Sequence, residues 1–295
     1  MHKMRKRTFA NISNYLSLVK FSHTIFSLPF AFIGFFLAVS DEQYSLSFKL
    51  LLLVVLCMFF ARNAAMGFNR YIDRDIDKKN PRTLIREIPM QIIKPSSAFL
   101  FVIINSILFI ATTFFINKLC FYLSPIALLV VLGYSFTKRF TFLCHLILGI
   151  GLSLAPIGAY LAVTEEFDIL PVLYSLAVLF WVSGFDIIYA LPDEEFDITQ
   201  NLKSIPAYIG KKNAIIVSII FHSITAFFIL LAGFYHNFAY LYWIGSLIFI
   251  GLLIYQHLLV KPNDLSKINI AFFATNGFAS IFFSIFVIAD LYFMK

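Results

Sequence analysis

KLLLLVVLCMFFARNAAMGFNRYIDRDIDKKN occupies residues 49–80, and it changes within a few positions from an apolar run to a dense cluster of charges. The apolar part, residues 49–68, has the length of about 20 residues that an α-helix needs to cross the hydrocarbon core of a bilayer. The charged part follows where such a helix reaches water. This stretch therefore predicts a transmembrane helix that carries an acidic site at one face of the membrane.

The rest of the chain has the composition of a membrane protein. Of its 295 residues 60% are hydrophobic and 13% are charged, whereas a soluble domain is about 45–50% apolar and about 25% charged. The predicted fold class is an all-α polytopic membrane protein, a single domain over residues 1–295. We expect nine transmembrane helices, at residues 20–39, 49–68, 97–116, 119–136, 143–163, 171–190, 213–233, 238–260 and 268–290.

The basic residues are distributed unevenly between the two ends of these helices. If the N-terminus is cytoplasmic, all but three of the 23 Lys and Arg residues lie on the cytoplasmic side, the exceptions being Lys49, Lys118 and Lys295. Because positively charged loops stay in the cytoplasm, we expect a plasma (inner) membrane protein with a cytoplasmic N-terminus and cytoplasmic acidic loops. The C-terminus is then on the opposite side. This topology accounts for the net charge of +7, so no nucleic-acid partner is expected.

The two halves of the chain contain similar segments. Residues 33–39 read IGFFLAV and residues 157–163 read IGAYLAV, so five of the seven positions are identical. An acidic cluster follows the next helix in each half, at nearly the same offset. Chance similarity between low-diversity apolar segments is the alternative. The shared offset favours an internal repeat, in which the first four helices correspond to the next four and enclose one binding cavity.

The first acidic cluster begins where the helix at residues 49–68 ends. Asn69, Asp73 and Asp77 are spaced four residues apart, so on a helix they form one polar column. Two carboxylates and an amide oxygen on one face suit Mg²⁺, which takes oxygen ligands and shares the phosphate oxygens of a substrate. The alternative is a solvated loop of alternating charges, but such loops rarely align these three side chains.

The second acidic cluster lies at the end of the helix at residues 171–190. Asp193 and Asp197 repeat the four-residue spacing. Asp186 lies within the helix or at its end, where an ionisable group is costly and is a functional candidate by default. Pro192 disfavours a continuous helix, so we expect a new turn there with Asp193 at its beginning. Two facing acidic clusters repel each other, and Mg²⁺ together with a diphosphate would balance their charge.

Basic residues around the two clusters are candidates for binding a diphosphate. An allylic diphosphate ionises when cations stabilise the negative charge that develops on the leaving group. Any one of these residues could instead serve only as a topological anchor, so the group as a whole carries the prediction. The group consists of Arg62, Arg82, Arg86, Lys138 and Arg139.

At these positions the sequence resembles the UbiA superfamily of intramembrane aromatic prenyltransferases. The resemblance covers more than half of the chain, and the paired acidic motifs are specific to that superfamily. The flanking residues look most like the 4-hydroxybenzoate polyprenyltransferase-like branch. The similar segments are NRYID at 69–73 and on to Asp77, NPRT at 80–83, YSFTKR at 134–139, and GFDIIYA at 184–190 and on to Asp193 and Asp197.

The resemblance implies Mg²⁺-dependent transfer of a polyprenyl group from polyprenyl diphosphate to an aromatic acceptor. The acceptor would be 4-hydroxybenzoate or a related precursor of ubiquinone or menaquinone. It also implies nine helices around a central cavity, with Tyr134 and Lys138 at the diphosphate and Arg62 and Asp186 near the acceptor. Magnesium and diphosphate would be held by Asn69, Asp73, Asp77, Asp193 and Asp197. The candidate catalytic residues are Asp73, Asp77, Asp186, Asp193 and Asp197.

Three alternatives remain open at this point. A small-molecule transporter would also have repeats and charges within the membrane, but it would not need metal-binding columns at two helix ends. The CDP-alcohol phosphotransferases use an acidic motif that contains Asp-Gly, and this chain has no Asp-Gly dipeptide. Within the superfamily, the acceptor could also be a naphthoate, haem or chlorophyll precursor.

Overall fold

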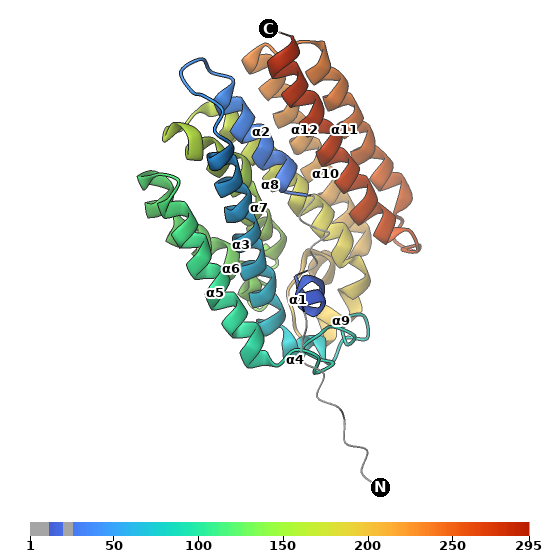
Figure 1. Cartoon of the computed structure of the whole chain (residues 1–295). Helices are drawn as coiled ribbons and strands as arrows, with labels where there is room; N and C mark the ends of the chain where they lie inside the picture. The colour runs from blue at the N-terminus through green and yellow to red at the C-terminus, as the bar shows by residue number, and fades with distance from the viewer. Residues whose placement is uncertain (1–11, 20–25, 295) are drawn as a thin grey trace.

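The structure, a computed structural model, describes residues 12–19 and 26–294. These residues form a bundle of long helices joined by short loops, and within them we find no β-strand. The long helices in Figure 1 are α2 (Leu28–Val39), α3 (Phe48–Ile72), α5 (Pro95–Phe114), α6 (Lys118–Thr137), α7 (Cys144–Thr164), α8 (Ile169–Ala190), α10 (Ile205–His236), α11 (Tyr240–Leu259) and α12 (Thr275–Phe293). The short helices are α1 (Ile12–Leu18), α4 (Arg74–Asp77), η2 (Leu191–Asp193), α9 (Glu194–Thr199) and the π-helix η3 (Ile270–Ala274).

The helical bundle confirms the predicted fold class. Among the described residues, eight helices are long and apolar enough to cross a membrane, and they correspond to the second to ninth predicted helices. The predicted first helix is described from Leu28, as the 12-residue apolar helix α2, while residues 20–25 lie outside the described part. The chain is therefore a multi-pass membrane protein.

The largest error in the predicted helices concerns α10, which begins at Ile205 and not near residue 213. Ser204 caps this helix by accepting a hydrogen bond from the N–H of Ala207, and Pro206 suits the first turn, where its missing N–H is not needed. Gly210 then adopts a φ of 79°, which residues with a Cβ rarely adopt, and the helix kinks there. Lys211 and Lys212, which precede the predicted start of this helix, therefore belong to α10.

Both acidic motifs lie where a membrane helix gives way to a short helix. Asp73 separates α3 from α4 with φ −86° and ψ 1°, and Asp193 separates α8 and η2 from α9 with φ −89° and ψ −1°. The new turn predicted after Pro192 is thus confirmed. The nearly identical backbone angles at the two aspartates support the predicted internal repeat, which stays a prediction.

The helices that carry the two similar segments pack against each other in the middle of the bundle. Gly34 in α2 faces Pro156 in α7 so closely that a Cβ on Gly34 would lie 2.0 Å from the carbonyl oxygen of Pro156. Beside this contact, the fully buried Trp181 of α8 packs against Phe30 of α2 and Phe249 of α11. This tightly packed centre holds α7 and α8, whose ends form the site, in a fixed relation.

Asp290 of α12 caps the neighbouring helix α11 from the side. Its buried carboxylate accepts hydrogen bonds from the N–H groups of Ala239, at 2.9 Å, and Tyr242, at 3.0 Å. These are donors that a helix N-terminus leaves without intrahelical partners, and the helix dipole favours a negative charge there.

We therefore expect Asp290→Asn to destabilise the protein by about 1 kcal/mol, the typical contribution of a helix cap. Thermal unfolding in detergent should show a lower midpoint for Asp290→Asn than for the wild type. Glu42→Gln, at an exposed acidic residue of the α2–α3 loop, is the control. Equal midpoints for both variants would mean that the carboxylate does not stabilise α11.

Candidate active site

The loop after α4 brings the two acidic motifs together at one end of the bundle, where Figure 1 shows α4 and α9. Asn80 Nδ2 donates to Asp193 Oδ1 at 3.0 Å, and Arg82 Nη1 lies 3.0 Å from Asp193 Oδ2. Next to them, Lys79 Nζ donates to Gln200 Oε1 at 3.2 Å. Residues more than 110 positions apart therefore form one polar site, as the sequence predicted.

Asp73 is the most enclosed carboxylate of this site, with a side chain only 2% exposed. Lys138 Nζ lies 2.5 Å from its Oδ2, and Arg139 Nη2 lies 2.9 Å from its Oδ1. Asn69, one turn earlier on α3, donates its amide to Oδ2 at 3.2 Å. The predicted column is therefore observed for its first two members, Asn69 and Asp73. Lys138 and Arg139, which directly follow α6, balance the charge of Asp73.

Two further predicted cations, Arg86 and Arg82, pair with the motif carboxylates Asp77 and Asp193. Arg86 Nη1 lies 2.7 Å from Asp77 Oδ1 and 2.9 Å from its Oδ2, and Asp77 is buried. Arg82, besides its contact with Asp193, stacks on the ring of Tyr189 at 4.5 Å and donates to the carbonyl of Tyr189 at 3.2 Å. The guanidinium of Arg82 is therefore held in place from two sides.

The sequence argument expected Mg²⁺ to balance the facing acidic clusters. The structure shows that basic residues of the chain also contribute to this balance. Leaving such a buried carboxylate without a partner costs several kcal/mol, so the ion pairs explain how the motifs fold together. The pairs join each predicted diphosphate-binding residue to a predicted metal-binding one: Lys138 and Arg139 to Asp73, Arg86 to Asp77, and Arg82 to Asp193.

Asp197 has a different kind of partner, because it accepts a hydrogen bond from Ser204 Oγ at 2.7 Å. Ser204 also caps α10, so this contact ties the second acidic motif to the start of the next membrane helix. The sequence analysis quoted Asn80 within a similar segment but assigned neither Asn80 nor Ser204 to the site. Only the fold brings these neutral side chains to the aspartates.

Asp186 lies about two helical turns before Asp193 and contacts a histidine. His145 Nδ1, at the start of α7, is 2.7 Å from Asp186 Oδ2. The Nε2 of the same ring accepts a hydrogen bond from the N–H of Ile205 at 3.4 Å. A single histidine in an apolar run has no ligand spacing, so His145 could not be assigned a role from the sequence alone.

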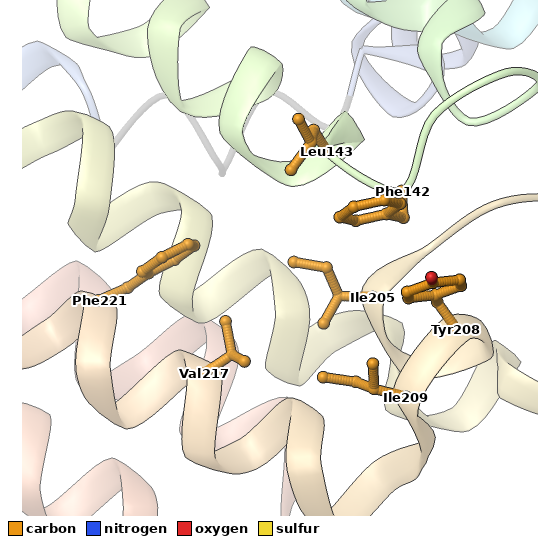
Figure 2. A pocket seen from close by; sticks show the side chains of 7 residues that line it. All are labelled: Phe142, Leu143, Ile205, Tyr208, Ile209, Val217 and Phe221. Atoms are coloured by element: carbon orange, nitrogen blue, oxygen red, sulfur yellow. The ribbon is translucent and has the colours of Figure 1, made fainter.

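Beside this histidine is an apolar cavity of about 200 Å³. Figure 2 shows the rings of Phe142 and Tyr208 face to face across one end of it, with centroids 4.8 Å apart. The lining contains no charged side chain, so the cavity offers nothing to hold a diphosphate. It is lined by Phe142, Leu143, Ile205, Tyr208, Ile209, Val217 and Phe221.

Tyr134 connects the acidic motifs to the deeper part of the site. This tyrosine on α6 lies four residues before Lys138, whose ammonium group contacts Asp73, and its hydroxyl donates to Met66 Sδ on α3 at 4.0 Å. Arg62 is on α3, about two turns before the first motif. Tyr134 therefore lies against the helix that carries both Arg62 and the first acidic motif.

The oxygen ligands of the site have the chemistry that Mg²⁺ requires. Carboxylate and amide oxygens without nitrogen or sulfur ligands favour this hard cation. Within residues 12–19 and 26–294, however, no three His, Cys, Asp or Glu side chains are grouped as a ready metal site. Binding of a metal therefore requires the cations to exchange their carboxylate partners for an anionic ligand. The fitting ligands are Asn69, Asp73, Asp77, Asp193 and Asp197.

The structure is a helical membrane bundle with paired acidic and basic residues at one end. The sequence model of the UbiA prenyltransferase family matches residues 27–284. The chain therefore belongs to the UbiA prenyltransferase family, and it is a prenyltransferase. The resemblance inferred from the motifs is confirmed.

Two bacterial relatives illustrate the similarity. The 4-hydroxybenzoate octaprenyltransferase of Coxiella burnetii (strain CbuK_Q154) is 28% identical over 264 residues, which cover 86% of this chain and 89% of the relative. The enzyme of the same name from Vesicomyosocius okutanii is 31% identical over 216 residues, covering 73% and 79%. The similarity thus extends over most of both chains.

Solved structures agree with this assignment. The apo structure of a UbiA homologue from Aeropyrum pernix K1 has a TM-score of 0.82 and 30% identity, and the match covers 91% of this chain and 98% of that one. A UbiA homologue from Archaeoglobus fulgidus bound to GPP and Mg²⁺ has a TM-score of 0.71 at 21% identity, covering 94% and 99%. The second comparison shows the same fold.

Proposed function

We propose that this prenyltransferase moves a polyprenyl group from polyprenyl diphosphate to 4-hydroxybenzoate or a related quinone precursor. One observation carries the proposal: Lys138, Arg139, Arg86 and Arg82 each pair with a motif carboxylate, at distances of 2.5 to 3.0 Å. Such a site gains most from a ligand that brings divalent cations to the carboxylates and negative charge to the basic residues. A magnesium diphosphate does both, and the names of the bacterial relatives support the acceptor and a long prenyl chain.

In this proposal the basic residues separate from the motif aspartates when the substrate binds. Mg²⁺, held by Asn69 and the motif aspartates, supplies Lewis-acid stabilisation of the diphosphate oxygens. Lys138, Arg139, Arg82 and Arg86 leave the carboxylates and bind the diphosphate. Tyr134 lies beside them and contacts the same group. The electrostatic stabilisation that each basic residue loses on leaving its carboxylate is thereby recovered at the diphosphate.

The reaction breaks the bond between the allylic carbon and the diphosphate oxygen, and the electron pair leaves with the diphosphate. The electron-rich ring attacks the allylic cation at the carbon ortho to its hydroxyl. The ring proton then passes to a carboxylate or to the released diphosphate, which restores aromaticity. Arg62 and Asp186 hold and orient the ring of the acceptor.

We further propose that the site faces the cytoplasm of the plasma (inner) membrane. The basic loops support this orientation through the preference of positive charge for the cytoplasm. In Figure 1 the C-terminal end of α12 lies at the opposite end of the bundle from α4 and α9. Labelling of single cysteines placed in the α4–α5 loop and in the α2–α3 loop, with an impermeant reagent, distinguishes the two sides.

The proposal is tested with the purified protein in proteoliposomes, supplied with octaprenyl diphosphate and a panel of acceptors. The panel contains 4-hydroxybenzoate, a hydroxynaphthoate and benzoate, which lacks the phenol, and products are identified by mass spectrometry. We expect prenylated 4-hydroxybenzoate or hydroxynaphthoate with Mg²⁺, and no product with benzoate. Product formation after complete removal of divalent cations would contradict the metal assignment, and absence of any prenylated product would contradict the proposed function.

A further inference from the structure

We infer that His145 is a positioning residue that fixes one oxygen of Asp186, so that the other oxygen receives the hydroxyl group of the aromatic acceptor. This inference rests on the proposed function and deepens it, because it names the acceptor contact and the residue behind that contact. Neither residue lies in the metal and diphosphate cluster formed by the two acidic motifs.

The two partners differ in their exposure. The His145 side chain is 4% exposed, whereas that of Asp186 is 24% exposed. The Nδ1 of His145 contacts Asp186 Oδ2 at 2.7 Å. In the described part of the chain, Oδ1 of Asp186 has no hydrogen-bond partner. The His145 side chain is therefore buried, whereas Asp186 is partly exposed and keeps one oxygen available for another donor.

The contacts of the imidazole determine where its proton lies. Because the N–H of Ile205 donates to Nε2 at 3.4 Å, Nε2 carries the lone pair. Nδ1 is therefore the nitrogen that carries the proton donated to Asp186. Ser183, one turn before Asp186 on α8, donates its hydroxyl to the carbonyl of His145 at 3.1 Å. The ring is thus oriented from α7, α8 and α10 at once.

This arrangement gives the carboxylate a defined direction. An aspartate on a membrane helix is otherwise free to rotate or to find another donor, and each alternative removes the acceptor oxygen from the site. With Oδ2 held by the Nδ1–H of His145, Oδ1 remains available as a hydrogen-bond acceptor. A suitable partner for Oδ1 of Asp186 is a hydrogen-bond donor on the aromatic acceptor, and a phenolic hydroxyl is such a donor.

The alternative is that His145 only packs α7 against α8 and α10. That role predicts lower stability when the ring is removed, with equal effects on both substrates. A positioning role predicts a selective effect on the acceptor, because the diphosphate site uses other side chains. The two explanations therefore differ in the KM values for the two substrates, measured separately.

We expect His145→Leu to raise the KM for the phenolic acceptor by about 10-fold, because the substitution removes a hydrogen bond to a charged group. The KM for polyprenyl diphosphate should stay within about twofold of the wild type. His145→Asn, which keeps a donor nitrogen at the δ position, should restore most of the acceptor affinity. His257→Leu is the matched control, because His257 is a membrane histidine on α11 whose hydrogen bond goes to His222.

Binding of the acceptor without prenyl diphosphate, measured by calorimetry, supplies a readout independent of turnover. We expect weaker binding to His145→Leu, and nearly wild-type binding to His145→Asn and His257→Leu. If His145→Leu does not fold, His145→Ala replaces it in both measurements. Equal loss of affinity for both substrates, or unchanged acceptor binding in a folded variant, would overturn the inference. Failure of the proposed function is recognised separately, as absence of transfer by the wild-type protein.

Discussion

We expect Asp73→Asn and Asp193→Asn each to reduce turnover by about 10³-fold or more, while both variants still insert and fold. In the proposed reaction these carboxylates hold Mg²⁺ against the leaving diphosphate, and that electrostatic stabilisation is the largest contribution to the rate. A loss of about 10³-fold corresponds to roughly 4 kcal/mol in the activation free energy. An amide keeps the shape of the side chain but provides a much weaker metal ligand.

The ion pairs of the structure explain why these variants fold. Asn at position 73 still offers an oxygen to Lys138 or Arg139, which are about 30% exposed and so remain partly hydrated when the charge of Asp73 is removed. Asp193 is itself partly exposed, and Asn80 can donate to the carbonyl of an Asn there. Size-exclusion profiles and unfolding midpoints in detergent verify folding before the rates are compared.

Matched controls separate the metal site from general loss of acidic charge. Asp75→Asn changes the neighbouring carboxylate of α4, which is 69% exposed. Glu195→Gln does the same on α9, at an exposed position. Both should retain wild-type turnover and the wild-type dependence on Mg²⁺ concentration. Wild-type rates for Asp73→Asn or Asp193→Asn would show that the motif containing that residue does not bind the metal.

The sequence was sufficient to predict the helices because each is an apolar run of membrane-spanning length. The start of α10 was wrong because residues 205–212 contain a glycine and two lysines, which resemble a loop. A Ser cap and a kink at Gly210 allow a helix there nonetheless. The π-helix η3 was not predicted, since its hydrogen-bond pattern has no distinct signature in the sequence.

The site was predictable at the level of residue types, but its contacts were not. Four-residue spacing placed Asn69 and Asp73 on one face of a helix, and the structure shows them hydrogen-bonded. The partner of Asp73 on α6 is 65 positions away, and Asp186 and His145 are 41 positions apart. Only the packing of helices α3, α6, α7 and α8 decides which of many cations and histidines meets which carboxylate.

Lys138→Ala lowers kcat by about 10²-fold, and the contacts of Lys138 show why it differs from its neighbour. Arg139 is held by the carbonyl oxygens of Ser135 and Ile72 as well as by Asp73. Among the described residues, the ammonium group of Lys138 contacts only Asp73. Lys138 is therefore the cation that can most readily move to the diphosphate when Mg²⁺ takes its place on the carboxylate.

The effect should fall on kcat more than on substrate binding. Charge on the leaving oxygen grows as the allylic bond breaks, so a point charge aimed at it stabilises the transition state more than the bound substrate. Losing one such preorganised group costs about 10²- to 10³-fold. Lys138→Arg should recover only part of the rate, because a planar guanidinium does not replace a compact ammonium.

A purely topological role for Lys138 leads to a different result. In that case a correctly inserted Lys138→Ala protein turns over normally, since Arg139 preserves the positive charge of the loop and its contact with Asp73. Lys212→Ala, at an exposed lysine of α10, is the control and should show normal topology and normal turnover. Turnover and cysteine accessibility are measured on the same preparation. Correct topology with an unchanged kcat would show that Lys138 only anchors the loop, and correct topology with a kcat about 10²-fold lower assigns it to the leaving group.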